Sequence, residues 1–593
     1  MKKTLQNIIR AYFSTWAIML ILGANVREPL SFVLFLLLFL FFGKTAADSA
    51  ENKKEQTGRV PFTVCAGLFT LFTLLAKGSD LTASFSSRLF QTGALLVCGA
   101  GLFILWSRIL LYIGCLLLKA DTGRLFWRED MGKGISGFFM RRCFLFSFVI
   151  LVLLWLPFYL YEYPGIFSPD GIVQMEQVLG VRALSDHHPA AHTMCMALLF
   201  RLGRQISVCF PDTDPLIFGA GFYTLIQLLF HAFCCSLCIR LIRNLRVHIG
   251  FVIGALLFFA LCPYHAVFSV YAGKDTPFAD ITLLLLICIV HLVCPGTGFG
   301  RRKDLILFVI TGIAFCLFRG NGFYAFLIFI PFLLFFFRKA LLPCLPAAAI
   351  VVAGALIIKG PVYSMAGVEP GDFVESLHVP LQQVARVISQ DRAVTQEETA
   401  LIEKCVNHIE DIKTVYDPAF ADMEKELIRV NGDQEYLAAH KADYLKLWIS
   451  LGLRNPDCYL NAWTDLTKAY WYPDEEYEIA LIEGVSANEL GLHSFPLIGG
   501  KLVVKAREII MKLGSFLPLY GLSFAMGTCF FLLLFALALI LAIPCEKKRI
   551  LVPVLPLCLF LTLFLAAPVA EFRYAYPMIC ALPLIAAVCV TKM

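Results

Sequence analysis

Charged side chains are scarce in this sequence, and their scarcity excludes a water-soluble fold. Only 16% of the residues are Asp, Glu, Lys or Arg, whereas soluble proteins carry roughly a quarter. Apolar residues make up 59% of the chain, which is more apolar surface than a core surrounded by water can hide. They form successive runs of about 17 to 25 residues, the length that a helix needs to cross a bilayer. The sequence therefore predicts an all-α integral membrane protein.

Other absences narrow the class further. The apolar runs lack strict alternation, which disfavours a barrel. The net charge of +6 forms no basic stripe, because Lys and Arg gather at the ends of apolar runs, so no nucleic-acid partner is expected. Most of the 21 cysteines lie inside apolar runs and predict no zinc or disulfide framework, although Cys405 and Cys458 are a candidate disulfide pair. Lys2, Lys3 and Arg10 precede an apolar run without a small-residue cleavage site, which indicates a retained anchor.

About fourteen membrane-spanning helices are predicted. They lie near residues 8–24, 29–43, 60–76, 89–118, 143–161, 216–239, 248–268, 276–294, 305–318, 321–337, 340–358, 515–543, 550–567 and 573–590. Loops rich in Lys and Arg alternate with loops poor in them, and the positive-inside rule places the rich loops in the cytoplasm. The rich loops are 44–59, 119–142, 240–246, 301–303, 338–339 and 547–549. A multi-pass protein of the cell membrane with both termini in the cytoplasm is expected.

Four regions follow from this pattern. They are an accessory N-terminal bundle of about four helices (1–142), a transmembrane core with an external loop at 162–215 (143–359), an external helical domain (360–513), and C-terminal helices that complete the core (514–593). In the external loop, a run from about 190 to 210 carries Arg201 and Arg204, so it is expected to lie in the interface with Leu198, Leu199 and Leu202 buried in lipid. Helical periodicity in the external domain covers 384–388, 401–409 and 436–451.

The strongest candidate for chemistry is the segment after the fifth span, Ser168-Pro169-Asp170-Gly171. A carboxylate held in a rigid turn at the membrane surface can act as a general base, since desolvation raises its basicity. Asp170 is therefore the candidate catalytic base, and Gln174 is a candidate for substrate binding. The alternative is that the segment is only a turn, with Asp chosen for its hydrogen bonds to the backbone.

Downstream in the same loop stands Asp186-His187-His188-Pro189. Adjacent histidines point in different directions on a regular element, so His187 and His188 are expected to bind substrate and not to share one metal. Asp186 either binds substrate or caps the helix that His188-Pro189 opens. A divalent cation held by Asp170 or Asp186 together with phosphate oxygens stays an open alternative.

Three further motifs fall, by the predicted topology, on the same external boundary. Ionisable groups at that depth are expensive and usually functional, although the alternative is a surface ion pair for Lys274-Asp275 and a plain tight turn for the Arg319 motif. Cationic side chains there suit a lipid phosphate, and Arg does so with two-pronged geometry. The candidate binding residues of these motifs are Lys274 and Asp275, Arg319 and Asn321, and Glu571, Arg573 and Tyr574.

The order of these motifs resembles the GT-C glycosyltransferase superfamily, membrane enzymes that transfer a sugar from a polyprenyl-phosphate carrier on the outer face. In that superfamily a catalytic Asp or Glu lies in the first long external loop, often with a His-Pro element downstream, and Asp170 and His188-Pro189 match those positions. From about residue 143 to 593 the chain is more closely similar to uncharacterised membrane proteins of Gram-positive bacteria. Those proteins share the Lys-Asp turn, the Arg-x-Asn-Gly turn, a Pro-Leu-Gln-Gln-x-Ala-Arg element at 380–386 and a Glu-x-Arg-Tyr close. The tandem Asp-Glu or Asp-x-Asp of better-studied relatives is missing, so metal dependence stays open.

The resemblance implies a GT-C-like fold with an external active site. Asp170 would deprotonate an acceptor hydroxyl, while Lys274, Arg319 or Arg573 stabilises the departing lipid phosphate. The expected partners are a polyprenyl-phosphate sugar donor, an envelope glycan, lipid or protein acceptor, and membrane lipids, with no cofactor apart from the open divalent cation. A transporter or flippase of a lipid-linked or envelope precursor is the alternative, and it predicts charges at the bilayer midplane and broken helices in matched repeats.

Overall fold

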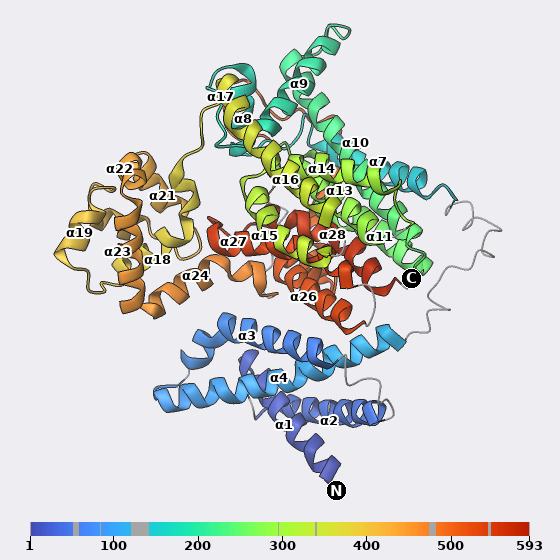
Figure 1. The fold of residues 1–593 in the computed structure, drawn as a ribbon, viewed down its shortest axis with the longest axis vertical. Helices are drawn as coiled ribbons and strands as arrows, with labels where there is room; N and C mark the ends of the chain where they lie inside the picture. The colour runs from blue at the N-terminus through green and yellow to red at the C-terminus, as the bar shows by residue number, and fades with distance from the viewer. Residues whose placement is uncertain are drawn as a thin grey trace.

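The protein is helical almost throughout. The computed structural model describes residues 2–25, 27–50, 59–83, 85–119, 141–294, 296–338, 341–473, 482–543 and 547–591 (Figure 1). Within these ranges the extended chain forms isolated β-bridges and no β-strand. The basic residues predicted for cytoplasmic loops at 51–58 and 120–140, together with Lys339, lie outside the described residues.

The first four helices form a layer of their own below the other helices in Figure 1. These are α1 (Lys2–Ile21), α2 (Pro29–Ala50), α3 (Arg59–Ala83) and α4 (Arg88–Lys119). The layer contacts the remaining helices mainly through α3 and α26, where the rings of Phe69 and Phe531 stack with centroids 4.1 Å apart. Aromatic stacking and apolar packing therefore join the two layers.

The larger bundle is built around helices that are apolar on every side. Its members are α7 (Cys143–Tyr161), α10 (Pro215–Asn244), α11 (Ile249–Leu261), α12 (Pro263–Val270), α13 (Asp275–Val293), α14 (Arg301–Phe318), α15 (Gly320–Phe336), α16 (Leu341–Ile357), α26 (Met526–Ala542), α27 (Leu551–Ala566) and α28 (Phe572–Val590). Of these, α13, α27 and α28 are the most deeply buried inside the protein. A helix without a polar face is typical of a bundle core or a membrane span.

Eight helices among the described residues are long and apolar enough to cross a membrane, or nine if α11 and α12, bent by 57°, make one span. The protein is therefore a multi-pass, membrane-embedded helical protein. Each of the fourteen predicted segments overlaps one of the helices above or the α11–α12 pair, although the segment 515–543 also covers the end of α25 (Lys501–Phe516) and η7 (Gly521–Phe524) before α26 begins. The count differs because the apolar parts of α2, α15 and α26 have 17 residues or fewer, while α1 and α14 begin with charged residues.

The loop between α7 and α10 contains two helices, α8 (Pro169–Leu179) and α9 (Ala190–Ser207). The interpretation of Ser168-Pro169-Asp170-Gly171 as only a turn is wrong, because Pro169 occupies the first position of α8, where a missing N–H costs nothing. Helix α9 covers the predicted interfacial run, and its Leu198 side chain is 62% exposed. That apolar face is free to contact lipid.

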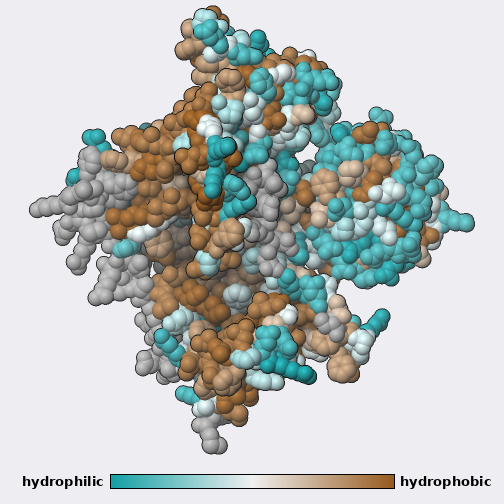
Figure 2. Space-filling model, turned by 180° about the vertical axis from the view of Figure 1, so that it is seen from behind, coloured by the Kyte–Doolittle hydropathy of each residue, from teal (hydrophilic) through white to brown (hydrophobic). Residues whose placement is uncertain are grey.

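Residues 373–471 form a lobe of short helices beside the bundle (Figure 1). Figure 2 shows a largely hydrophilic surface over the lobe and a hydrophobic one over the bundle. A separate core that includes Val374, Val387 and Leu451 holds the lobe together. Its elements are η5 (Phe373–Ser376), α18 (His378–Ser389), α19 (Gln396–Ile402), α20 (Ile409–Val415), α21 (Asp422–Arg429), α22 (Gln434–Ala439), α23 (Lys441–Arg454) and α24 (Pro456–Trp471).

Short elements flank the lobe along the chain. They are η4 (Ile358–Val362) and α17 (Tyr363–Met365) before it, and α25 (Lys501–Phe516), η7 (Gly521–Phe524) and η8 (Lys547–Ile550) after it. The predicted helical stretches 401–409 and 436–451 are both interrupted in the structure. Between α19 and α20 the Cys405 carbonyl accepts from the backbone amide of Asp433, and His440 separates α22 from α23. Cys405 and Cys458 are free thiols, so this candidate pair forms no disulfide.

Candidate functional site

Backbone pairing brings the start of α8 next to the turn before α13. The amide of Ile166 donates to the Val270 carbonyl at 2.9 Å, and the amide of Ala272 donates to the Ile166 carbonyl at 2.8 Å. Gly171 lies so close to this turn that an added Cβ would stand 2.9 Å from the Ala272 carbonyl oxygen. Only a residue without a side chain fits at this contact, and the contact places the first turn of α8 beside Lys274.

Asp170 lies between two cations that come from distant parts of the chain. Its Oδ2 accepts from Lys274 Nζ at 3.2 Å and from Arg573 Nη1 at 2.8 Å. Arg573 also pairs with Glu571 and donates to the Tyr574 hydroxyl at 3.3 Å. The first turns of α8 and α28 and the residue before α13 thus converge on one carboxylate.

His188 completes this group, and we call Asp170, His188, Lys274 and Arg573 the Asp170 cluster. Burial by itself raises the pKa of Asp170, but the positive charges of Lys274 and Arg573 outweigh it and hold that pKa well below its ordinary value. Burial and Lys274 lower the pKa of His188 to about 2, so its ring is neutral at physiological pH. His188 Nδ1 lies 3.1 Å from Lys274 Nζ, and an ammonium only donates, so the ring proton is on Nε2.

A buried ion pair supports the cluster from the bundle side. Arg319 Nη1 lies 2.8 Å from Asp275 Oδ1, and their side chains are 8% and 1% exposed. The Arg319 guanidinium also lies over the ring of Tyr574, 4.4 Å from its centroid, a cation–π arrangement. Because Asp275 follows Lys274 and Tyr574 follows Arg573, this pair fixes the neighbours of both cations.

Other predicted site residues lie apart from the Asp170 cluster. Asp186 accepts from the Ala190 amide at 3.1 Å, at the start of α9, and pairs with Lys359 at 3.2 Å. The amide nitrogen of Gln174 contacts the buried His192 and Thr193 at 2.9 and 2.8 Å, and that of Asn321 donates to Thr562 of α27 at 3.2 Å. These contacts join helices to one another.

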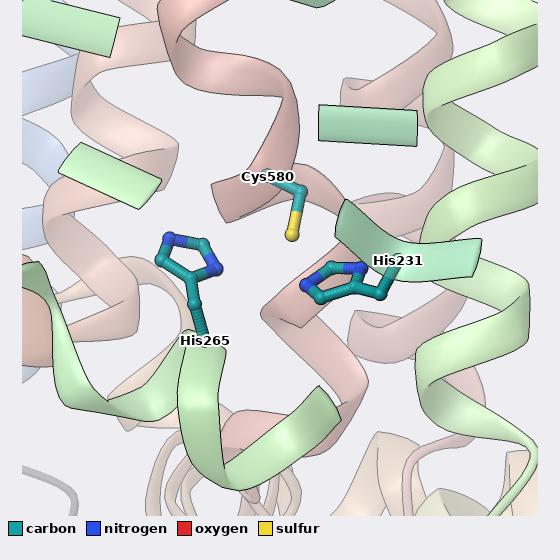
Figure 3. Close-up of side chains that lie close together, drawn as sticks. All are labelled: His231, His265 and Cys580. Carbon is teal, nitrogen blue, oxygen red and sulfur yellow. The ribbon is translucent and has the colours of Figure 1, made fainter. Parts of the chain in front are cut away.

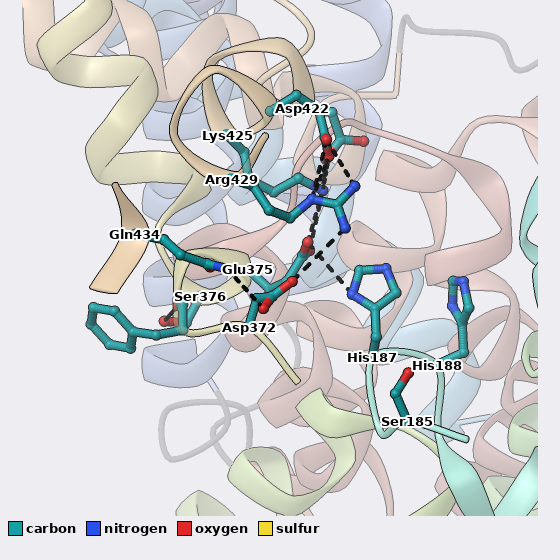
Figure 4. A network of polar contacts seen from close by, with 12 residues as sticks. Ser185, His187, His188, Asp372, Glu375, Ser376, Asp422, Lys425, Arg429 and Gln434 are labelled. Carbon is teal, nitrogen blue, oxygen red and sulfur yellow. Dashed lines mark hydrogen bonds and ion pairs between the residues drawn. The ribbon is translucent and has the colours of Figure 1, made fainter. Parts of the chain in front are cut away.

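His187 points toward the lobe, where it meets a charged network (Figure 4). Its Nδ1 lies 3.7 Å from Glu375, whose carboxylate pairs with Lys425 at 3.0 Å. Asp372 belongs to the same network. Its Oδ1 accepts a hydrogen bond from Gln434 Nε2 at 3.1 Å, and its Oδ2 lies 3.8 Å from Arg429 Nη1. The network connects the loop that carries His188 to the lobe.

Two groups among the described residues have metal-ligand spacing, and neither includes Asp170 or Asp186. They are His187 with Asp372 and Glu375, and His231 with His265 and Cys580. In the first group the carboxylates already face Lys425 and Arg429, so their charge is compensated. The second is fully buried in the bundle. A divalent cation at Asp170, which the sequence leaves open, would compete with Lys274 and Arg573 for the same oxygen.

Sequence reasoning missed the residues that align the cluster. The Tyr271 hydroxyl lies 2.8 Å from the Ser168 hydroxyl and 3.5 Å from Arg573 Nη1, so it ties α8 to α28. Residues 484–486 also pair with Phe167, whose amide donates to the Gly484 carbonyl at 3.0 Å. No local pattern signals these contacts, because each partner is an ordinary turn residue in the sequence.

The cluster can hold an anion and move a proton. Lys274 and Arg573 present charged donors to one point, and an Arg fork suits phosphate or carboxylate. Asp170 can accept a proton once its cations are engaged elsewhere, because its low pKa depends on them.

The protein was compared with protein families, curated proteins and solved structures. No curated protein and no solved structure matches the chain. A family match over residues 181–592 includes His188, Lys274, Arg319 and Arg573 and begins after Asp170. That family is described as a family of unknown function, DUF6020, and because its match spans more than half of the chain, the protein belongs to it.

Proposed function

We propose that the protein is a GT-C-type glycosyltransferase with fourteen spans, which moves a sugar from a polyprenyl-phosphate carrier to a cell-envelope acceptor on the external face of the cell membrane. The observation that carries the proposal is the Asp170 carboxylate between Lys274 and Arg573. Glycosyl transfer from a lipid phosphate needs a base for the acceptor hydroxyl and cations for the leaving phosphate within a few ångströms of each other. Both kinds of group are present at this point.

Helix termini add to the attraction for phosphate. Asp170 lies in the first turn of α8, Lys274 directly precedes α13, and Arg573 lies in the first turn of α28. The first N–H groups of each helix have no partner within the helix, and the N-terminal end of its dipole is positive. Three such ends around two cationic side chains favour a phosphate.

Donor binding and activation of the base are coupled in this mechanism. The donor phosphate takes over the bonds of Arg573 and Lys274, so Asp170 loses the charges that hold its pKa low. The acceptor hydroxyl then gives its proton to Asp170, and its oxygen forms a bond to the anomeric carbon. The bond from that carbon to the phosphate oxygen breaks, and polyprenyl phosphate leaves with the electron pair, stabilised by the two cations.

Replacement of Asp170 tests the proposal in cells. Envelope glycans of a strain that lacks the gene are compared by mass spectrometry after complementation with wild-type protein, Asp170→Asn or Asp212→Asn. Asp212 is an exposed aspartate of the same loop and serves as the matched control. We expect the glycan product with wild type and Asp212→Asn and its loss with Asp170→Asn at equal protein level in the membrane. Product formation by Asp170→Asn would exclude Asp170 as the base.

Transport of a lipid-linked or envelope precursor is the second candidate function, and one buried pair of ionisable side chains favours it. Asp280 and His231 lie 2.7 Å apart, and both side chains are 1% exposed. Ionisable groups buried in a membrane bundle often mark transport pathways. Movement of a fluorescent polyprenyl phosphate across vesicles by the full-length protein, lost in Asp280→Asn, would support transport over transfer.

A further inference from the structure

We infer that His231, His265 and Cys580 form a binding site for one zinc ion inside the bundle. The three residues come from α10, α12 and α28, so the chain brings them together over more than three hundred residues. Figure 3 shows the Cys580 sulfur between the two imidazole rings. One ligand atom from each residue lies within 4.8 Å of the other two. Tetrahedral zinc holds such atoms roughly 3.5 Å apart, so the site closes with small side-chain movements.

The donor set fits zinc better than the other common divalent cations. Two imidazoles and one thiolate are borderline to soft ligands, which Zn²⁺ binds and which Mg²⁺ and Ca²⁺ avoid. The Tyr576 hydroxyl lies 2.7 Å from His231 Nε2 and 2.9 Å from His265 Nδ1. It is therefore placed to provide an oxygen at the fourth corner. All four side chains are buried, so solvent does not compete for the ion.

A carboxylate behind His231 gives independent support. Asp280 Oδ1 lies 2.7 Å from His231 Nδ1, and a histidine that binds a metal through one nitrogen commonly donates through the other to a carboxylate. The thiol of Cys234 is also a polar neighbour of the Asp280 carboxyl. A buried carboxylate with such partners needs a positive charge nearby. The two charges of Zn²⁺ balance one Cys580 thiolate and one Asp280 carboxylate.

The expected role of the ion is to hold helices together. Cys580 lies seven residues, about two turns, after Arg573 on α28, while Asp280 lies on α13, the helix that follows Lys274. An ion bound by α10, α12 and α28 fixes the position of α28 against these neighbours. Structural zinc adds its binding free energy to folding, so removal of the ion should lower thermal stability.

Metal analysis of the purified full-length protein tests this inference without any activity assay. The protein is solubilised from membranes in detergent, purified without metal-affinity resin, incubated with Zn²⁺ and desalted, and its zinc is measured by mass spectrometry. We expect about one zinc per chain in wild type and a background level in His265→Ala and Cys580→Ser. Cys238→Ser is the matched control, since Cys238 is a buried thiol of α10 outside the group, and it should keep the zinc.

A second measurement covers the case in which a variant fails to fold. Wild type loaded with Co²⁺ should show a thiolate-to-cobalt absorption band, and Zn²⁺ should displace it. A strong chelator should lower the thermal unfolding midpoint of wild type but not that of Cys580→Ser. Wild type without zinc, a metal content dominated by another ion, or full zinc content in Cys580→Ser would each overturn the assignment.

Discussion

In the proposed mechanism, Asp170→Asn should bind polyprenyl phosphate more tightly than wild type while losing activity. In wild type, Asp170 Oδ2 accepts from both Lys274 Nζ, at 3.2 Å, and Arg573 Nη1, at 2.8 Å. A phosphate must displace this carboxylate before it can use the two cations. Asparagine keeps the size of the side chain but removes its charge, so the competition weakens and the repulsion of the phosphate ends.

The size of the gain in affinity follows from the charged hydrogen bonds of Asp170, which the phosphate must break in wild type but not in Asp170→Asn. A hydrogen bond to a charged group contributes about 1.5–3 kcal/mol, and 1.4 kcal/mol corresponds to about a tenfold change in affinity. Because the asparagine oxygen still accepts a weaker bond, we expect the lower end of this range, an increase of about tenfold. Loss of the proposed general base should reduce turnover by about 10²- to 10⁴-fold in the same variant.

Binding is measured with full-length protein in lipid nanodiscs and a fluorescent polyprenyl phosphate, at equal ionic strength. Asp212→Asn is the control and should bind as wild type does. If Asp170→Asn bound the lipid as weakly as wild type or more weakly, the exchange of Asp170 for phosphate at Lys274 and Arg573 would be refuted. Loss of turnover alone would not rescue that mechanism.

Three further predictions concern other ionisable side chains. Arg319→Met leaves the buried Asp275 without its cation and should lower the free energy of unfolding by about 3–5 kcal/mol; thermal unfolding should show partial recovery in the double variant with Asp275→Asn. Burial raises the pKa of Glu424 in the lobe to about 7, which is above the value in the unfolded chain. The folded protein therefore binds this proton more tightly, and the free energy of unfolding should fall as the pH rises from about 4.5 to 7. Glu424→Gln should remove this pH dependence when unfolding is measured at pH 5 and at pH 8. His188, with a pKa of about 2, stays neutral from pH 5 to 8, so His188→Gln should lower activity without changing the shape of the pH–rate profile over that range.

Apolar runs predicted the positions of the bundle helices because lipid and core packing both select long apolar helices. The predictions failed where a local sequence pattern fitted two different structures or where a tertiary contact ended a helix. Pro169 is typical both of a turn and of the first position of a helix. The turn interpretation overlooks α8, which begins at Pro169. In the lobe, periodicity continued through 401–409, but the chain breaks there because the Cys405 carbonyl bonds to the Asp433 amide. A tertiary contact of this kind leaves no trace in local periodicity.

The candidate site was predictable only as a set of residues on one boundary. Charge at the ends of apolar runs placed Asp170, Lys274 and Arg573 on the same side, yet spacing carries no information about a bond between residues 403 positions apart. Nor does the sequence distinguish Asp186, which pairs with Lys359, from Asp170. The sequence does not identify Cys580 and His231 as candidate metal ligands for another reason. Single polar residues inside apolar runs are usually buried parts of a core.

The Asp170 cluster and the group of His231, His265 and Cys580 are mechanically connected through α28 and α13. Arg573 and Cys580 stand on one helix, and Lys274 and Asp280 on or next to another. A helix moves nearly as a rigid unit, so a shift of α28 by 1 Å would stretch the 2.8 Å contact between Arg573 and Asp170 beyond hydrogen-bond length. Residues that hold α28 against α10 and α12 therefore control the geometry at Asp170 without touching substrate. For that reason, variants of His265 or Cys580 that fold should weaken phosphate binding even though every residue of the Asp170 cluster is intact.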